Sequence, residues 1–389
     1  MITVSEAKQA LYSKVRTLNP VIIPLSESAG MVVAEDIKSP IDMPGFLQSS
    51  MDGYAVNSFT TDQFLPLQNE LPAGTNLMLT LQEGKAIKVF TGGPVPAGAV
   101  WVVQKEWVEE KEGGIFIRQV KQETGLNIRM PGSSVQKDTV VITRDTCLHA
   151  YQISMLASLG ITHVSVFPAP KIALIITGNE LVIPGNMLAY SQVYESNSIG
   201  LTAALKQLGV HQIQLSWVKD ILVDTKAAID QALQWADLIL LTGGVSVGDY
   251  DFVATAAREL GVETIFHGVK QKPGKPLYAG QFNQKLILGL PGNPSSVLHC
   301  FQQYVKPVIQ LTMGMQLSLT QQARLAHDYE KNTPLDFFVK ASLLNGEVTI
   351  SAAQASYQVG AFSEANCWVE LPAAEFRFSK GQLVTVYLF

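Results

Sequence analysis

Hydrophobic and polar positions follow two different periods along the chain, and the middle of the chain alternates regularly between them. Continuously apolar runs at 172–176 and 238–241 are typical of strands that are covered on both faces. Between and after them, the periodicity predicts strands at 212–218 and near 264, a hairpin through 280–284, and helices at 197–208, 225–235, 250–260 and 294–311. We therefore predict a parallel sheet with helices on both sides, which places ligands at the carboxyl ends of its strands.

The pattern differs on either side of this region. Thr3 and Glu6 have the spacing of a capping box, and we expect the helix that they begin to run to about Thr17. From about 40 to 132, glycine and proline interrupt short β-rich runs, which predicts a mostly β insertion with long loops. After about 317, alternating runs predict a small C-terminal β-barrel or sandwich, at 337–344, 348–352, 368–371 and 383–388.

These regions predict a multidomain α/β and β fold with four parts. A discontinuous helical linker domain comprises 1–43 and 133–170, and a β-rich insertion domain occupies 44–132. A three-layer αβα domain spans 171–314, and a C-terminal β-barrel domain spans 315–389. The length of 389 residues agrees with several domains, because a domain typically has about 150 residues.

Composition and charge narrow the classes of function. Hydrophobic residues make up 47% of the chain and charged residues 16%, which favours packed cores over disorder. Lysine and arginine number 28 against 33 acidic residues, a formal charge of −5, so the chain lacks the basic surplus of a nucleic-acid binder. A local site must therefore hold any anionic ligand.

Cysteine use and hydropathy indicate the cytoplasm. The three cysteines, Cys147, Cys300 and Cys367, are far apart, which argues against a disulfide framework or a CxxC metal site. The first residues show no signal-peptide pattern, and no apolar run approaches the roughly 18 residues of a spanning helix. We expect a protein of the reducing cytosol that is neither secreted nor embedded in a membrane.

The strongest local signal follows the apolar run at 238–241. It reads Thr-Gly-Gly-Val-Ser-Val-Gly-Asp-Tyr-Asp and contributes six candidate ligand-binding residues, Thr242, Gly243, Gly244, Ser246, Gly248 and Asp249. Glycines let the backbone approach a ligand closely, and amide N–H groups at a strand–turn–helix junction bind anions such as phosphate. The alternative is that Asp249 and Asp251 only cap the following helix.

Two lysines lie on a loop that proline stiffens. In Gln-Lys-Pro-Gly-Lys-Pro-Leu, Lys272 and Lys275 precede Pro273 and Pro276, so the segment cannot be helical. The ammonium groups repel each other unless an anion lies between them, by up to a few kcal/mol at an effective dielectric constant of about 20. The loop therefore indicates an anion site, and the alternative is a solvated loop without a ligand.

A third junction, at 288–296, repeats the order of strand, glycine turn and helix. Asn293 suits an N-cap and Pro294 the first helical position, so Gly292 and Asn293 again offer a helix start to an anion. Ordinary helix capping explains these residues equally well. Because all three turns follow strands of one predicted sheet, we expect them to converge at its carboxyl edge.

Carboxylates should face the same edge. Glu180 follows the strand at 172–177, Asp220 follows the strand at 212–218, and Asp251 ends the glycine turn. Such a cluster needs cations, most naturally Mg²⁺ on Glu180 and Asp251 together with the two lysines. These features indicate phosphoryl-bond chemistry. The sequence has no HExxH or GxSxG pattern and no Walker A or GxGxxG pattern in a suitable context.

With these motifs in order, the chain resembles the molybdopterin molybdenumtransferases of the MoeA and gephyrin E-domain family. The matching motifs run nearly end to end, at 44–55, 91–98, 127–129, 137–138, 177–181, 242–251, 272–276 and 290–294. The resemblance implies a homodimer in which each active site lies between the αβα molybdopterin-binding domain of one subunit and the Ser-Met-Asp-Gly-Tyr loop of the other. It also implies that molybdate is inserted into adenylylated molybdopterin with a divalent metal, releasing AMP and molybdenum cofactor.

The resemblance further implies residue roles. Asp52 and the neighbouring Tyr54 would act from the partner subunit, although the residues alone indicate only an Asp-Gly turn. Glu180, Asp220 and Asp251 would handle the metal and the phosphate end of the substrate, and Lys272 and Lys275 would neutralise pyrophosphate and molybdate. Other expected substrate contacts are Pro276, Ser296, Lys340 and Ser356. A molybdopterin adenylyltransferase and molybdoenzyme chaperones are the implied partner proteins.

Several positions depart from the usual family pattern, among them Val100, Thr333 and Pro334. Three others bear on the expected site. Asn179 replaces the aspartate of Thr-Gly-Asp-Glu-Leu, Ser134 lies where an acidic residue is usual, and Lys340 replaces an arginine. A lysine lacks the bidentate geometry of arginine. A second hypothesis is therefore a divergent, non-catalytic or weakly active paralogue that binds molybdopterin or a partner protein.

Overall fold

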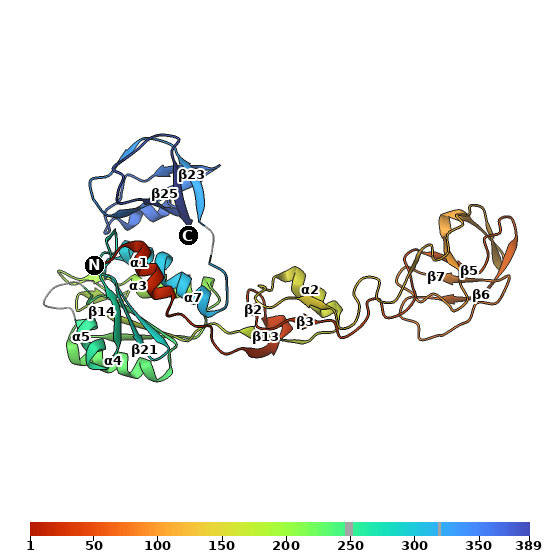
Figure 1. Cartoon of the computed structure of the whole chain (residues 1–389), viewed down its shortest axis with the longest axis horizontal. Helices are drawn as coiled ribbons and strands as arrows, with labels where there is room; N and C mark the ends of the chain where they lie inside the picture. Colours follow the sequence, from red (N-terminus) through yellow and green to blue (C-terminus); the bar gives the residue numbers. More distant parts are fainter. Residues whose placement is uncertain (246–251, 318–319) are drawn as a thin grey trace. The chain divides into compact units, whose positions relative to one another are not determined.

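The computed structural model describes residues 1–245, 252–317 and 320–389, which form two compact units (Figure 1). The first unit comprises Met1–Val21, Gly30–Ala34 and Ser165–Phe389, and the second comprises Ile22–Ala29 and Glu35–Val164. The chain passes between them in short elements, β1 (Val21–Pro24), η1 (Leu25–Glu27), β2 (Val32–Val33) and β13 (His163–Phe167). In the described ranges, no helix combines the length and the hydrophobicity that a membrane span requires.

The second unit is mostly β structure, as its glycine and proline content predicted. Six strands form one sheet in the order β8-β5-β7-β6-β10-β9. Their bounds, in this order, are Trp101–Gln104, Gly53–Val56, Ala86–Val89, Phe64–Leu71, Gly114–Ile117 and Val108–Lys111. Buried Trp101, Val103 and Ile115 belong to its core. Smaller elements complete the unit, namely β3 (Ile37–Lys38), β4 (Gln48–Ser49), η2 (Lys105–Trp107), β11 (Ile128–Arg129), β12 (Val140–Ile142) and α2 (Ala150–Ser158).

A six-stranded sheet forms the centre of the first unit. Its order is β17-β14-β18-β22-β21-β19, with bounds Ile213–Val218, Ile172–Thr177, Leu238–Thr242, Lys285–Leu290, Tyr278–Phe282 and Glu263–His267. The first four strands are parallel, whereas β21 is antiparallel to both β22 and β19. The sheet is therefore mixed rather than wholly parallel, because the hairpin between β21 and β22 reverses the chain. β19 still runs in the direction of β22, so both strands end at one edge.

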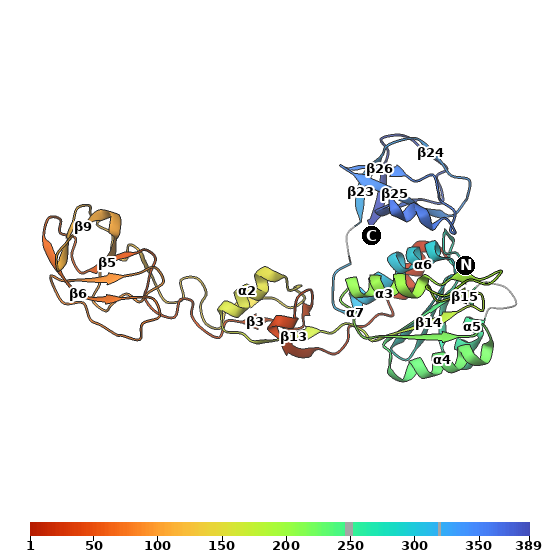
Figure 2. The same cartoon turned by 180° about the vertical axis from the view of Figure 1, so that it is seen from behind.

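Helices cover both faces of this sheet (Figure 2). One face carries α1 (Val4–Tyr12), α3 (Asn197–Gln207), α6 (Pro294–Cys300), the π-helical turn η3 (Phe301–Val305) and α7 (Lys306–Thr312), and the other carries α4 (Leu222–Trp235) and α5 (Phe252–Glu259). Ile172, Leu174 and Ile176 join the first core, and Ala173 and Ile175 join the second. This two-sided burial explains the continuously apolar strand in the sequence.

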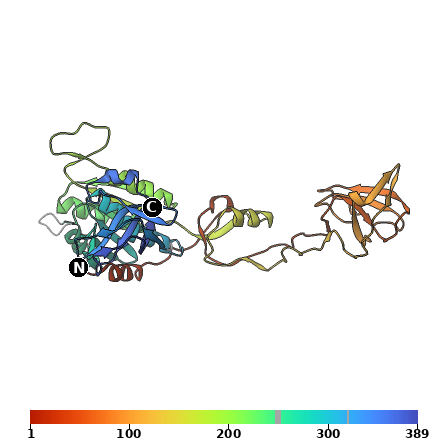
Figure 3. The same ribbon diagram turned by 90° about the horizontal axis from the view of Figure 1, so that it is seen from above.

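The first helix begins as predicted and ends earlier than predicted. Thr3 and Glu6 form both hydrogen bonds of the capping box, and buried Val4, Ala7 and Leu11 pack into the core from the helix beside the N-terminus in Figure 3. The helix ends at Tyr12 instead of about Thr17. β-Branched residues and the Asn-Pro pair that follow disfavour its continuation.

The C-terminal part is a closed β-barrel, which confirms the predicted fold of this region. Its strands follow the order β20-β25-β26-β23-β29-β27 and close through β25 and β27, with bounds Gln271–Lys272, Asp336–Leu344, Glu347–Ile350, Gln321–Leu325, Leu383–Leu388 and Cys367–Leu371. The remaining elements are β24 (Tyr329–Glu330), η4 (Val359–Ser363) and β28 (Arg377–Phe378). The strand β20 comes from the lysine loop of the αβα region, and its Lys272 pairs with Phe337 of β25. This pairing joins the loop to the barrel.

Candidate functional site

The glycine turns after β18 and β22 contact each other at the carboxyl edge of the sheet. The N–H of Gly243 donates to the carbonyl oxygen of Leu290 at 3.2 Å, and a Cβ on Gly292 would lie 3.8 Å from the Cα of Gly243. Gly243 has a φ of +85°, and a Cβ there would lie 2.6 Å from the carbonyl oxygen of Thr177 at the end of β14. The position therefore requires glycine for both its conformation and its space.

Two carboxylates follow the neighbouring strands at this edge. A Cβ on Gly244 would lie 3.3 Å from Oδ1 of Asp220, and the N–H of Asp220 donates to Oδ1 of Asn179 at 3.4 Å. Burial raises the pKa of Asp220, and the nearby charge of Glu180 raises it further. Two carboxylates that repel each other in this way favour a bound cation.

Four buried polar atoms at this edge lack a hydrogen-bond partner within the described ranges. They are Oδ1 of Asn197, Oδ1 of Asp220, Oγ1 of Thr242 and Oγ of Ser295. The side-chain amide of Asn197 donates to the carbonyl oxygen of Gly292 at 2.8 Å, which places the residue beside the third turn. Because buried polar atoms normally have partners, such a cluster indicates a place where a ligand or ordered water completes the hydrogen bonds.

Sequence reasoning missed three of the residues at this edge, Asn197, Ser295 and Thr177. Oγ1 of Thr177 donates to the carbonyl oxygen of Thr242 at 3.2 Å and links the ends of β14 and β18. Asn197 begins α3 and lies outside the three turns that the sequence singled out, so only the tertiary fold brings it to Gly292. A signal for Ser295 was present, because it belongs to the same Asn-Pro-Ser-Ser run as Ser296.

The third turn ends in the helix α6. Asn293 is the N-cap residue and Pro294 lies in the first turn, as the sequence predicted, but the side chain of Asn293 makes no capping hydrogen bond. Asn293 therefore occupies the N-cap position, but its side-chain amide does not cap the helix. Ser296 is buried in the same turn, where a helix has N–H groups without intrahelical partners.

The two loop lysines are exposed between β19 and β21. Nζ of Lys272 lies 4.9 Å from the ring centroid of Phe337, and neither lysine forms an ion pair with a described carboxylate. Pro276 is partly buried beside Lys275. A Cβ on Gly274 would lie 2.5 Å from Sγ of Cys300, so the loop packs on α6, the helix that begins at the third turn.

Lys340 is fully buried in β25, and its ammonium group faces backbone carbonyls. It donates to Ala355 at 3.3 Å and to Gln358 at 3.0 Å, and Nζ lies 5.4 Å from the ring centroid of Phe362. Burial lowers its pKa. Ala355 and Gln358 flank the partly exposed Ser356, so the hydrogen bonds of Lys340 fix the loop that carries Ser356.

Asp52 lies in the second unit, in the turn before β5. Its Oδ1 accepts hydrogen bonds from the N–H and the hydroxyl of Thr91, both at 2.8 Å, and these bonds lower its pKa. A Cβ on Gly53 would lie 1.9 Å from the carbonyl oxygen of Val103 in β8, so position 53 requires glycine. The following Tyr54 is buried, and its hydroxyl donates to Glu110 inside the unit.

Four of the predicted site residues, including the metal ligand Asp251, fall outside the part of the chain that the structure describes. Ser246, Gly248, Asp249 and Asp251 all lie outside the described residues. Among the residues that are described, no group of three or more histidine, cysteine, aspartate or glutamate side chains could hold a metal ion. Glu180 and Asp220 form the described part of the carboxylate cluster.

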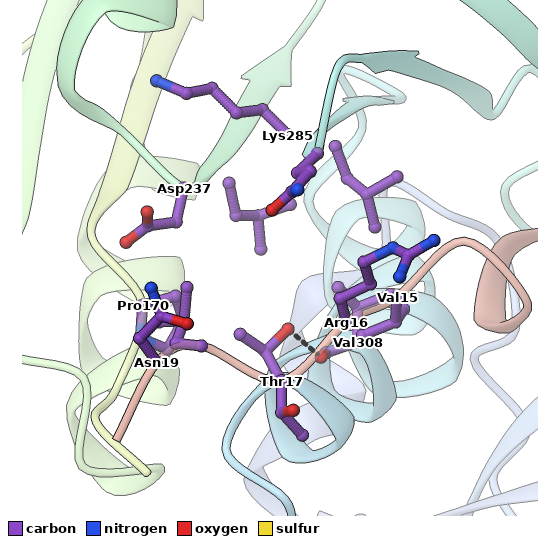
Figure 4. A pocket seen from close by; sticks show the side chains of 13 residues that line it. Val15, Arg16, Thr17, Asn19, Pro170, Asp237, Lys285 and Val308 are labelled. Atoms are coloured by element: carbon purple, nitrogen blue, oxygen red, sulfur yellow. Dashed lines mark hydrogen bonds between the residues drawn. The ribbon is translucent and has the colours of Figure 1, made fainter. Parts of the chain in front are cut away.

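A cavity of about 190 Å³ lies at the opposite, amino edge of the sheet (Figure 4). Its labelled polar lining residues are Arg16, Thr17, Asn19, Asp237 and Lys285. Asp237 accepts a hydrogen bond from the N–H of Lys171 at 2.8 Å, and Lys285 donates to the carbonyl oxygen of Leu233. None of the described buried atoms without partners belongs to this lining. The carboxyl edge is therefore the stronger candidate for a ligand site.

Three family models match consecutive parts of the chain. The MoeA N-terminal region (domain I and II) matches residues 2–160, and the "Probable molybdopterin binding domain" matches residues 173–311. The MoeA C-terminal region (domain IV) matches residues 322–389. The second of these models covers the whole sheet edge described above.

Similar proteins cover nearly the whole chain. The molybdopterin molybdenumtransferase of Haemophilus influenzae is 32% identical over 378 residues, which cover 94% of this chain and 93% of that protein. That of Staphylococcus epidermidis is 30% identical over 400 residues and covers 100% of this chain and 95% of its own length. The solved molybdopterin biosynthesis MoeA protein of Pyrococcus horikoshii has a TM-score of 0.87 and 30% identity, covering 100% of this chain and 99% of that one. The chain therefore belongs to the MoeA family of molybdopterin molybdenumtransferases.

Proposed function

We propose that this protein inserts molybdate into adenylylated molybdopterin, with cleavage of the adenylyl phosphoanhydride and release of AMP and molybdenum cofactor. The observation that carries the proposal is the cluster of four buried polar atoms at the carboxyl edge that have no partner among the described residues, beside two contacting glycine turns. A ligand rich in phosphate oxygens and hydroxyls offers both donors and acceptors to such a cluster. The relatives that align over nearly the whole chain carry the same activity in their names.

The two turns would hold the phosphate end of the substrate. The N–H of Gly243 is already bonded to Leu290, so Gly243 serves by letting the ligand approach the backbone rather than by donating. The first turn of α6, with Ser295 and Ser296, supplies N–H and hydroxyl donors to phosphate oxygens. Oγ1 of Thr242 completes the phosphate cradle, whereas Oδ1 of Asn197, which can only accept, would bond to a hydroxyl group of the substrate.

The carboxylates fit a divalent cation. Burial and the charge of Glu180 raise the pKa of Asp220, so an oxygen-preferring ion such as Mg²⁺ nearby would relieve the repulsion between the two carboxylates. We assign Glu180 and Asp251 as its ligands, with Asp220 beside them. When bound, the ion would neutralise phosphate charge and polarise the phosphoanhydride.

The two exposed lysines would neutralise the negative charge of the substrate that the metal ion leaves. Lys272 and Lys275 have no described ion-pair partner, so their charge is available to pyrophosphate and molybdate oxygens. Ser356 would approach from the barrel on the loop that Lys340 holds. Positive charge placed where negative charge develops is a major source of rate enhancement.

We further propose a homodimer in which Asp52 reaches the site of the partner subunit. Thr91 keeps Asp52 ionised and oriented, which suits a carboxylate that acts on a metal or a phosphate end. A molybdopterin adenylyltransferase would supply the substrate, and molybdoenzyme chaperones would receive the product. We assign the reaction to the cytoplasm, where three free cysteines stay reduced.

The test is AMP release from adenylylated molybdopterin by the purified protein, with and without molybdate and Mg²⁺. We expect AMP release that depends on both additions. The non-catalytic hypothesis predicts binding of adenylylated molybdopterin without AMP release, and that result would overturn the proposed activity. Lys340→Arg then addresses the departure from the family pattern, and no rate gain is expected, because Lys340 bonds to carbonyls rather than to substrate.

A further inference from the structure

A buried chain of hydrogen bonds connects the lysine loop to the helical segment beneath it. The hydroxyl of Tyr304 donates to Oε1 of Gln271 at 2.5 Å, and Nε2 of Gln271 donates to the carbonyl oxygen of Gly274 at 2.9 Å. Gln271 and Tyr304 both have exposed fractions of 0%. Buried polar side chains that are bonded in series hold one geometry, because breaking either bond leaves a buried group without a partner.

Gly274, whose carbonyl oxygen accepts the last of these hydrogen bonds, lies between Lys272 and Lys275. Gly274 has a φ of +86°, and a Cβ at this position would lie 2.5 Å from Sγ of Cys300, so the loop has no room to settle closer to α6. On one side, Val269 donates its N–H to the carbonyl oxygen of Lys275 at 2.9 Å. On the other, Lys272 pairs with Phe337 of the barrel. The backbone of both lysines is therefore fixed, while their ammonium groups stay exposed.

The same helical segment also forms the third turn of the site. α6 begins at the turn of Gly292 and Asn293, and it continues through η3, which contains Tyr304, into α7. A π-helical turn shifts the side chains that follow it relative to an α-helix and is frequent near functional sites. One continuous segment thus carries a phosphate-type turn at its start and the support of the lysine loop further along.

We infer that Gln271 and Tyr304 are positioning residues, which hold Lys272 and Lys275 in register with the turn at the start of α6. The inference rests on the proposed function, in which both lysines meet phosphate and molybdate oxygens of one substrate. Displacement of a reacting or charge-stabilising group by about 1 Å can lower a rate by a large factor. The pair acts through the loop and touches no substrate.

The first test is Tyr304→Phe, which removes the hydroxyl and keeps the buried ring. We expect kcat/KM for AMP release to fall about tenfold and the backbone amides of residues 268–277 to exchange hydrogen for deuterium faster than in the unchanged protein. In a background that carries both Lys272→Ala and Lys275→Ala, Tyr304→Phe should cause no further loss, because a residue that acts through these two lysines has nothing left to position. An additive loss would show a purely structural role and would overturn the inference.

Tyr387→Phe is the matched control. Its hydroxyl donates to Glu370 at 2.6 Å, between the barrel strands β29 and β27. We expect this variant to lose a similar hydrogen bond while kcat/KM and the exchange of the loop stay unchanged. Unchanged kcat/KM or unchanged loop exchange in Tyr304→Phe would overturn the inference.

The two proposals fail in different ways. If the unchanged protein releases no AMP, the proposed function fails, and titration with inorganic pyrophosphate then decides the positioning role. Weaker pyrophosphate binding in Tyr304→Phe than in Tyr387→Phe, together with faster loop exchange, supports the role. Equal binding in the two variants overturns it.

Discussion

The carboxyl edge of the αβα sheet and the interior of the β-barrel differ in how far the hydrogen bonds of their buried polar groups are completed within the protein. At the edge, Asn197, Thr242 and Ser295 each keep a buried oxygen without a described partner. In the barrel, the buried ammonium group of Lys331 donates to the carbonyl oxygens of Leu335 at 3.0 Å, Leu371 at 3.3 Å and Pro372. Hydrogen bonds completed within the protein indicate structural support, whereas a cluster of incomplete ones indicates a ligand.

A single unpartnered group does not make a site, and His299 shows why. Both of its ring nitrogens lack partners among the described residues, yet its ring centroid lies 4.4 Å from that of Phe338 and 5.3 Å from that of Trp368. Burial lowers the pKa of His299 to about 3, so the ring is neutral and packs as a core residue between α6 and the barrel. What distinguishes the edge is the number of such atoms beside contacting glycine turns.

The largest effect on activity is expected for Lys275→Ala. Loss of a cation that stabilises transition-state charge lowers rates about a hundredfold or more, and the exposed side chain contributes little to folding. AMP release and the melting temperature should be measured together, with Lys206→Ala on α3 as the exposed control. Unchanged turnover at an unchanged melting temperature would remove Lys275 from the site.

The largest effect on stability is expected for Lys331→Ala in the barrel. Three carbonyl oxygens lose a charged donor, and we expect the free energy of unfolding to fall by about 3 kcal/mol while turnover per folded molecule stays unchanged. Urea denaturation measures the change, with the exposed Lys380→Ala on the same barrel as control. Equal stability of the two variants would show that completed bonds in the barrel do not support its structure.

Thr242→Val sharpens the comparison, because it removes a hydroxyl that bonds to nothing in the described protein. Stability should stay the same or rise slightly, in contrast to Lys331→Ala, because no internal bond is lost. Affinity for adenylylated molybdopterin should fall about tenfold, since a hydrogen bond to a charged ligand is lost. Calorimetric titration measures the affinity, and a destabilised variant with normal affinity would place Oγ1 of Thr242 among the structural groups.

The smallest effect is expected for Asp220→Asn. The folded-state pKa of Asp220 is raised above its usual 3.8 by burial and by Glu180, so the ionised carboxylate opposes folding. The penalty is absent at pH values below 3.8, appears as pH rises through the raised pKa, and is complete at neutral pH. At pH 7 we expect a melting temperature about 1–3 °C higher than that of the unchanged protein, with the difference vanishing in acid. A lower melting temperature at pH 7 would contradict the repulsion.

Local pattern predicted most of the fold because strand burial and helix capping are local properties. The runs at 172–177 and 238–242 are strands with those bounds, and Thr3 begins a helix with a full capping box. The predicted hairpin is present between β21 and β22, but the pairing of β21 with β19 was not apparent, because it joins segments that no local period relates. The same limit applies to the site. Gly243 and Lys275 could be predicted because they belong to local sequence motifs, whereas Asn197 could not, because the packing of α3 brings it to Gly292.

Lys340 shows that a family position does not fix the contacts of a side chain. The resemblance implied a substrate contact, and the structure directs the ammonium group to Ala355 and Gln358 on the loop of Ser356. The alternating pattern predicted the strand β25, but it did not predict that Lys340 is buried in it together with its neighbours on both sides. The proposed substrate contact from this loop therefore rests on Ser356.

A crystal structure of the protein with adenylylated molybdopterin and Mg²⁺ tests the central claim most directly. We predict that the phosphate end lies at the carboxyl edge, within hydrogen-bond distance of Oγ1 of Thr242 and Oγ of Ser295, and that a hydroxyl group of the substrate or an ordered water donates to Oδ1 of Asn197. These atoms would then all have partners. Density for the ligand in the cavity at the amino edge, with the three oxygens still unpartnered or bonded only to water, would contradict it.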